Sequence, residues 1–127
     1  MLSYAVEKPF PLIKTDPSFM KRILTNLTLN GVQAMQEKGD GELSINAFPR
    51  EKSFIIAIAD TGPGIPDTVK EKIFMPLFTT KAKGQGFGLA VVKKLVDALG
   101  GNISFETKVG RGTTFIVELP LNPGGLS

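Results

Sequence analysis

The sequence predicts an α+β protein: a two-layer sandwich in which about three helices cover a mixed, mostly antiparallel sheet. Two observations lead to this class. The chain has 127 residues, which suits one domain with its own core. Its expected elements follow the order strand, helix, strand, strand, short helix, loop, helix, strand, strand. Strands and helices therefore do not alternate as they do in a doubly wound parallel fold.

The first half of the chain contains the clearest helix. A short strand is expected at residues 3–8, followed by a helix that Asp16 or Thr15 can cap and Gly39 can end. Pro17 suits the first turn of this helix. Apolar and small residues recur at helical spacing and predict its buried face, namely Phe19, Met20, Ile23, Leu24, Leu27, Gly31 and Ala34.

The next elements read as a hairpin and a turn. Residues 41–50 and 52–60 predict two strands joined by a tight turn, and the second is richer in apolar residues, so it should be the more buried. Residues 61–66 contain two glycines and two prolines and predict a loop. A short helix is expected at residues 67–74.

The last part of the chain completes the sandwich. Residues 75–86 lack periodicity and predict a loop, and residues 88–101 predict a second long helix that ends at a glycine pair. Residues 102–120 predict two strands around a glycine-containing turn, and residues 121–127 predict a frayed tail. With no internal repeat or linker, residues 1–127 are expected to form a single domain.

Composition excludes several kinds of chemistry. The chain has no cysteine and no histidine, so it offers no disulfide, no Ser-His pair and no zinc site of the usual kind. Any metal must rest on oxygen ligands, which favours magnesium or calcium. The net charge is only +3, and no basic stripe is interleaved with aromatic residues, so nucleic-acid binding is not expected. Six lysines gather in one segment and suggest a local anion site: Lys70, Lys72, Lys81, Lys83, Lys93 and Lys94.

Three glycine-containing stretches stand out, "DTGPGIP", "GQGFGL" and "GRGTTF". Glycines at a helix N-terminus can expose N–H groups to a phosphate, and "GQGFGL" directly precedes the second long helix. Neither a P-loop nor a dinucleotide fingerprint fits, because Leu89 and Ala90 stand where a P-loop needs Lys-Ser/Thr and no strand precedes the glycines. "GRGTTF" can be a simple hairpin turn. Asp60 can cap its turn or accept a hydrogen bond from an exocyclic amine such as that of adenine.

Two asparagines within the first helix are a further anomaly. Asn26 and Asn30 lie four residues apart, hence on one face, although asparagine is a poor residue for a helix interior. Helical geometry places both at the border between the apolar face and solvent. They are either polar residues tolerated on a solvated face or part of a wet site.

Taken in order, these stretches resemble the catalytic, ATP-binding domain of sensor histidine kinases, within the wider GHKL ATPase superfamily. "NLTLNGVQAM" is similar to the N box of that family, "DTGPGIP" to its first glycine box and "IFMPLFTTK" to its F box. "GQGFGL" resembles the second glycine box and "GRGTTF" a further Gly-Thr element. The resemblance covers residues 16–120, nearly the whole chain, and implies the Bergerat-type sandwich.

The resemblance also implies roles for individual residues. Asn30 would ligate magnesium, Asp60 would bind the adenine amine with support from Thr113, and Lys81 would neutralise the γ-phosphate. Asn26, Asn30 and Lys81 would form the catalytic set. For Phe74, Phe78 and Leu89, plain core packing is the alternative. The implied nucleotide-contacting residues are Asn26, Asn30, Gln33, Asp60, Gly62, Gly64, Ile65, Phe74, Phe78, Thr79, Thr80, Lys81, Gly84, Gln85, Gly86, Phe87, Gly88, Leu89 and Thr113.

The sequence departs from the family pattern at two positions of the first helix. Gln33 stands where many members have lysine, so the phosphate charge would be met by Lys81 or Arg22. Gly31 replaces a usual alanine, which should weaken the helix by up to about 1 kcal/mol.

Position 26 bears on the reaction. The hydrolases and serine kinases of the superfamily use a glutamate there as general base, whereas an amide cannot take a proton from water or serine. A neutral histidine acceptor already carries a lone pair. Asn26 therefore favours transfer to a histidine over hydrolysis. With the resemblance, it implies binding of Mg²⁺ with ATP (or ADP) and γ-phosphoryl transfer to a histidine of a separate dimerisation and phosphoacceptor domain in a two-component system. An ATP hydrolase or a non-catalytic nucleotide-sensing module is the alternative.

The expected partners follow from this function. They are the histidine-bearing domain of the same parent kinase and the receiver domain of a response regulator. The isolated domain is expected to be a cytoplasmic monomer without membrane contact, and membrane anchoring of the parent protein is left open.

Overall fold

The structure is a computed structural model that describes residues 2–6, 16–75 and 86–121. Strand β1 (Leu2–Val6) precedes helix α1 (Pro17–Lys38), which the hairpin of β2 (Leu43–Arg50) and β3 (Ser53–Asp60) follows. A 3-10 helix (Asp67–Lys72) and helix α2 (Gly86–Ala98) then lead to a second hairpin. That hairpin consists of β4 (Asn102–Lys108) and β5 (Gly112–Pro120).

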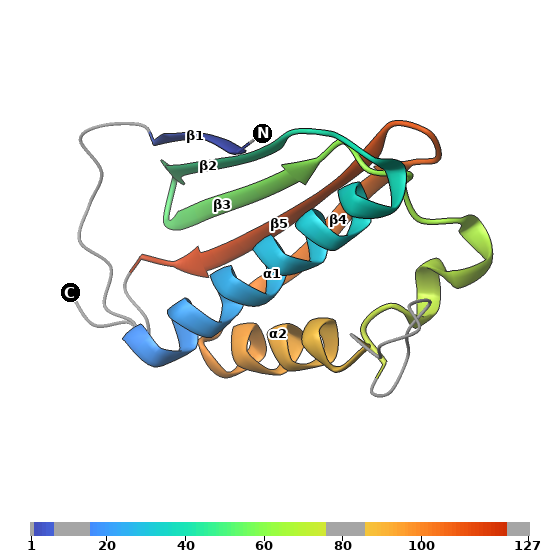
Figure 1. Ribbon diagram of the computed structural model, residues 1–127. Coiled ribbons are helices and arrows are strands. Elements are labelled where there is room, and N and C mark those ends of the chain that lie inside the picture. Colours follow the sequence, from blue (N-terminus) through green and yellow to red (C-terminus); the bar gives the residue numbers. More distant parts are fainter. Residues whose placement is uncertain (1, 7–15, 76–85, 122–127) are drawn as a thin grey trace.

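These elements form the predicted two-layer sandwich. The five strands make one sheet in the order β1-β2-β3-β5-β4, in which β1 pairs with β2 in parallel and all other pairs are antiparallel. Helices α1 and α2 lie side by side on one face of this sheet, and the 3-10 segment extends beyond its end (Figure 1). The prediction of a mixed, mostly antiparallel sheet under helices is confirmed.

The ends of α1 are fixed by local chemistry. The Asp16 side chain accepts hydrogen bonds from the backbone N–H groups of Ser18 and Phe19, and Gly39 ends the helix in the left-handed conformation with φ of 105°. Both predicted ends are confirmed. In the last turn, the buried residue is Met35, whereas Ala34 is only half-buried.

The core lies between the helices and the inner face of the sheet. Strand β3 is more buried than β2, as predicted, because it is the middle strand of the five, whereas β2 lies next to the edge strand β1. Its residues Phe54, Ile56 and Ile58 belong to the main hydrophobic cluster. The largest fully buried side chains in the described residues come from both layers, namely Phe115, Ile23, Leu27, Leu43, Ile58, Leu119, Val92, Val96 and Val117.

Several predicted boundaries differ from the structure, and the strand expected at residues 41–50 begins at Leu43. The short helix is a 3-10 segment that ends at Lys72, and α2 begins at Gly86, two residues before its predicted start. Leu121 does not begin a loose tail, since its backbone N–H donates to the Lys52 carbonyl at 2.9 Å. Most of the predicted 75–86 loop and the rest of the tail lie outside the described residues.

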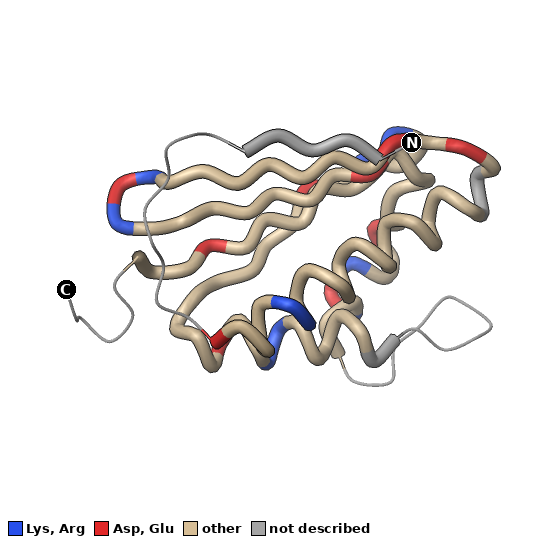
Figure 2. Tube along the Cα trace, turned by 60° about the vertical axis from the view of Figure 1, so that its left-hand side comes forward, with Lys and Arg blue, Asp and Glu red and all other residues tan. Residues whose placement is uncertain are grey.

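Charged residues are distributed over several elements (Figure 2). Two of the clustered lysines have acidic partners, because Lys70 pairs with Asp67 at 2.7 Å and Lys93 with Asp97 at 2.9 Å. The hydrogen bond from Lys70, together with its charge, lowers the pKa of Asp67. These two lysines are thus partly neutralised within their own helical turns. Lys81 and Lys83 lie outside the described residues.

Candidate functional site

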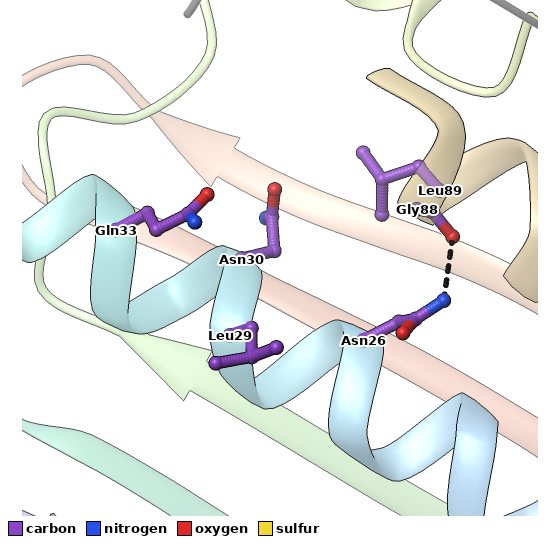
Figure 3. A pocket seen from close by; sticks show the side chains of 6 residues that line it. All are labelled: Asn26, Leu29, Asn30, Gln33, Gly88 and Leu89. Atoms are coloured by element: carbon purple, nitrogen blue, oxygen red, sulfur yellow. Dashed lines mark hydrogen bonds between the residues drawn. The ribbon is translucent and has the colours of Figure 1, made fainter. Parts of the chain in front are cut away.

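The first part of the candidate site lies between α1 and the beginning of α2. Asn26, Asn30 and Gln33 are all half-buried, which agrees with a position at the border of the core. Asn30 and Gln33 extend from the same side of α1, and Asn26 reaches across to α2 (Figure 3). The three side chains, together with Leu29, Gly88 and Leu89, line a cavity of about 30 Å³.

Asn26 joins the two helices. Its Nδ2 atom donates a hydrogen bond to the Gly88 carbonyl at 3.3 Å (Figure 3). The position therefore requires a donor, and a carboxylate there would set one oxygen against another. This bond links the N-box segment to the second glycine-rich segment, 62 residues away in sequence.

Gln33 contributes a buried amide oxygen to the candidate site. Its Oε1 atom is buried and has no hydrogen-bond partner within the described part of the chain. Leaving a buried acceptor unpaired is costly, on the order of 1–3 kcal/mol. The cavity has room for about one water molecule. Amide oxygens are suitable ligands for magnesium, which prefers oxygen and completes its coordination with water. The residues present thus fit a magnesium site.

The second part of the site is the end of strand β3. Asp60 is 8% exposed, and its Oδ1 atom accepts a hydrogen bond from the Gly62 backbone N–H at 2.8 Å. The prediction that Asp60 caps its turn is therefore confirmed for the Oδ1 atom. It does not exclude a ligand, since a carboxylate has further acceptor sites.

Close backbone approach explains glycines around Asp60. A Cβ atom on Gly31 would lie 2.6 Å from Leu43 Cδ1 and 3.4 Å from Asp60 Cβ. A Cβ atom on Gly112, whose φ is +132°, would lie 2.0 Å from the Asp60 carbonyl oxygen. Gly64 is equally restricted, because its Cβ would lie 2.5 Å from the Lys108 carbonyl oxygen. The glycines let α1, the 61–66 loop and the β4–β5 turn converge on Asp60.

Thr113 lies next to Asp60 on the inner face of the sheet. The two residues are directly paired across β3 and β5, and Thr113 is 5% exposed. The Thr113 hydroxyl is 2.8 Å from that of Thr107 on β4. A buried carboxylate and a buried hydroxyl thus end the otherwise apolar face of the sheet, and together they can bind a polar edge of a flat ligand.

Comparison with known proteins assigns this arrangement to a family. The family model described as "Histidine kinase-, DNA gyrase B-, and HSP90-like ATPase" matches residues 15–123. The chain belongs to this ATPase family.

Curated relatives narrow the assignment to histidine kinases. The chain is 38% identical to the sensor histidine kinase ZraS of Escherichia coli over 95% of its own length and 26% of that protein. It is 37% identical to sporulation kinase D of Bacillus subtilis over 95% of its own length and 23% of that protein. The chain thus spans only about a quarter of the length of these curated relatives.

Solved structures confirm both fold and family. The catalytic domain of histidine kinase ThkA superposes with a TM-score of 0.83 at 32% identity, over 94% of this chain and 78% of that one. Full-length ShkA in complex with AMPPNP superposes with a TM-score of 0.84 at 29% identity, over 97% of this chain and 26% of that one. The chain is therefore a histidine kinase-type ATPase domain.

Several predicted site residues of this domain lie outside the described residues. These are Phe78, Thr79, Thr80, Lys81, Gly84 and Gln85. Gly86 and Phe87 fall in the first turn of α2, and only their backbone is described. The part of the candidate site between α1 and α2 is thus represented by Asn26, Asn30, Gln33, Gly88 and Leu89.

The remaining predicted residues, Ile65 and Phe74, border the core of the ATPase domain. Phe74 makes edge contacts with Phe105 and Phe115, with ring centroids 5.9 Å and 6.3 Å away. Core packing is therefore at least one role of Phe74. Ile65 packs against the main cluster, and its backbone N–H donates to the Thr107 hydroxyl at 2.9 Å.

Sequence reasoning missed two threonines that hold the site together. Thr61 accepts a hydrogen bond from the Glu42 N–H at 2.8 Å and so ties the glycine loop to the start of β2. Thr107 contacts the loop, Gly112 and Thr113. Strand alternation places Thr107 on the same face as Ile103 and Phe105, which is the signal that could have identified it.

No helix among the described residues is long and apolar enough to cross a membrane.

Proposed function

We propose that this domain binds Mg-ATP and donates the γ-phosphoryl group to a histidine on a separate dimerisation and phosphoacceptor domain. The observation that carries the proposal is the cavity between α1 and α2, where amide groups stand and the hydrolytic members of the family would need a carboxylate. The chain itself has no histidine, so the acceptor must be elsewhere.

Asn26 supports transfer over hydrolysis. Its amide N–H is directed at the Gly88 carbonyl, so the side chain has a positioning task and no proton-accepting group. Water or serine needs a base to become a strong nucleophile, whereas neutral imidazole does not. The domain would thus hold the phosphates in place and leave the nucleophile to its partner.

The phosphate end would be organised by three sets of groups. Asn30 would ligate magnesium directly. The Gln33 oxygen, which has no hydrogen-bond partner among the described residues, would accept a hydrogen bond from a metal-bound water. Bound magnesium would neutralise part of the phosphate charge. The first N–H groups of α2 lack partners within the helix and would donate to the phosphates, helped by the helix dipole. Lys81 would add a positive charge, and Arg22 is the alternative source.

The base end would recognise adenine. Asp60 would accept a hydrogen bond from the 6-amino group, with Thr113 beside it and Ile65 against the ring. Gly62 and Gly64 allow the loop backbone to approach the base. Two acceptors at this edge would favour a purine that carries an amine over one that carries a carbonyl.

The partners would be those of a two-component system. One solved relative is the histidine kinase ThkA in complex with the response regulator protein TrrA, which superposes with a TM-score of 0.80. By analogy, a receiver domain would accept the phosphoryl group from the phosphohistidine. As an ATP-dependent kinase domain, the chain would act in the cytoplasm, as a monomer when separated from its parent protein.

Isothermal titration calorimetry and a phosphate-release assay on the isolated domain test this proposal together. We expect binding of ATP or ADP that weakens when EDTA removes magnesium, with neither autophosphorylation nor fast release of phosphate. Phosphate release that scales with the concentration of this domain would favour the ATP hydrolase instead. A pure nucleotide sensor would bind equally well but never pass the phosphoryl group to a histidine-bearing helical domain.

A further inference from the structure

A row of three polar residues crosses the sheet at the base end of the site. Asp60 on β3 pairs with Thr113 on β5, and Thr113 pairs with Thr107 on β4. Directly paired residues share a face of the sheet. The row therefore borders the apolar inner face, next to the pairs that Ile58 and Phe105 each make with Phe115.

Thr107 has a full set of hydrogen bonds. Its hydroxyl accepts from the Ile65 N–H at 2.9 Å and donates to the Gly112 carbonyl at 3.1 Å. Its third contact is the Thr113 hydroxyl at 2.8 Å. A hydroxyl has one proton, and a carbonyl can only accept. The arrangement that satisfies both contacts directs the proton of Thr107 to Gly112 and makes Thr113 the donor between the two threonines.

This direction determines what Thr113 can offer to a ligand. Its only proton is used on Thr107, so towards the site it can act only as an acceptor. An ionised Asp60 is also an acceptor and cannot donate. The edge formed by Asp60 and Thr113 therefore suits a ligand edge that donates, such as the 6-amino group of adenine. A 6-oxo purine, which presents an acceptor at the same place, would be disfavoured.

We propose that Thr107 is a positioning residue for base recognition, which fixes the direction of the Thr113 hydroxyl and holds the glycine loop through Ile65. The inference rests on the proposed ATP site and assigns its base selectivity to a residue that does not itself touch the base. Without the Thr107 hydroxyl, Thr113 can rotate and donate, and the edge loses part of its preference for an amine.

A purely structural role for Thr107 makes a different prediction. The bonds to Ile65 and Gly112 pin the 61–66 loop to the β4–β5 turn, and Gly110 adds a hydrogen bond to the Pro63 carbonyl at 2.8 Å. Loss of these hydrogen bonds would weaken the binding of every nucleotide by the same factor. The ratio of affinities for 6-amino and 6-oxo purines separates the two roles.

The experiment measures the affinities of ATP and inosine triphosphate, with magnesium, for the isolated domain and its variants. Thr107→Val removes the hydroxyl and keeps the shape, and Thr107→Ser restores the hydroxyl. Ser104→Ala is the control, because it removes an exposed hydroxyl from the same strand, where Ser104 pairs with Ile116 on the opposite face of the sheet. Circular dichroism and thermal unfolding check folding, and Thr107→Ala, which leaves room for a water at Ile65, replaces the valine variant if that does not fold.

We expect Thr107→Val to weaken the affinity for ATP by about three- to tenfold. The ratio of the affinities for ATP and inosine triphosphate should fall by a similar factor. Thr107→Ser should restore both values, and Ser104→Ala should change neither. An equal loss for both nucleotides, or no loss, would overturn the inference while leaving the ATP site intact. Absence of ATP binding in the unaltered domain would instead refute the proposed function, and the inference with it.

Discussion

Replacing Asp60 by asparagine changes one charge at the base end while keeping the shape of the side chain. Asp60 Oδ1 accepts from the Gly62 N–H at 2.8 Å, and an asparagine oxygen can keep this bond. Fold stability should therefore fall by no more than about 1 kcal/mol. The group beside that oxygen becomes an N–H donor, and it would face the donating amine of adenine.

The expected loss of affinity follows from the bond that disappears. A hydrogen bond to a charged group contributes about 1.5–3 kcal/mol, and each 1.4 kcal/mol corresponds to a tenfold change in the dissociation constant. Asp60→Asn should therefore weaken ATP binding by roughly 10- to 150-fold. The burial of Asp60, which is 8% exposed, places the effect at the upper part of this range because solvent cannot replace the lost bond.

Calorimetric titration with ATP at fixed magnesium measures this effect, and thermal unfolding measures stability on the same samples. Asp97→Asn is the matched control, since it also removes one carboxylate, on the exposed side of α2 where it pairs with Lys93 at 2.9 Å. We expect it to leave ATP affinity unchanged. Unaltered affinity in Asp60→Asn, or an equal loss in Asp97→Asn, would show that the base does not bind at Asp60.

Two further substitutions test the local geometry. Asn26→Asp places a carboxylate oxygen against the Gly88 carbonyl. We therefore expect the free energy of unfolding, measured with denaturant, to fall by about 1–2 kcal/mol and phosphate release not to increase. A gain in ATP hydrolysis would contradict the role given to Asn26. Gly112→Ala places a Cβ atom 2.0 Å from the Asp60 carbonyl oxygen and should lower the free energy of unfolding by about 3 kcal/mol or more. Gly110 has φ of +85°, and a Cβ atom there would have no atom within 4 Å. Gly110→Ala should therefore lower it by only about 1–2 kcal/mol. Equal losses in the two alanine variants would mean that steric contact with Asp60 is not what selects glycine.

Local chemistry made much of the fold predictable. The Asp16 cap and the Gly39 terminus of α1 depend only on residues near them in sequence, and both were predicted correctly. The burial of β3 follows from its unbroken apolar run. The start of α2 was less predictable, because Gly86 and Gly88 are weak helix formers that the following apolar turns keep helical.

Contacts between distant segments were not predictable from one sequence. Helix propensity alone predicts only that Gly31 weakens the helix, but its neighbours Leu43 and Asp60 leave little space for a side chain. The bond between Asn26 and Gly88 spans 62 residues and needs the packed helices to form. Thr107 looked like an ordinary strand residue, and its role depends on the loop that folds over it.

The most direct test of the proposed function is phosphoryl transfer between separate domains. Radiolabelled ATP with magnesium, this domain, and a helical dimerisation domain from a histidine kinase should give an acid-labile, base-stable label on the helical domain. The label should disappear when the acceptor histidine is replaced by glutamine, and fall strongly with Asn30→Ala in this domain. No transfer to any histidine-bearing partner, despite normal ATP binding, would contradict kinase function and leave a nucleotide sensor.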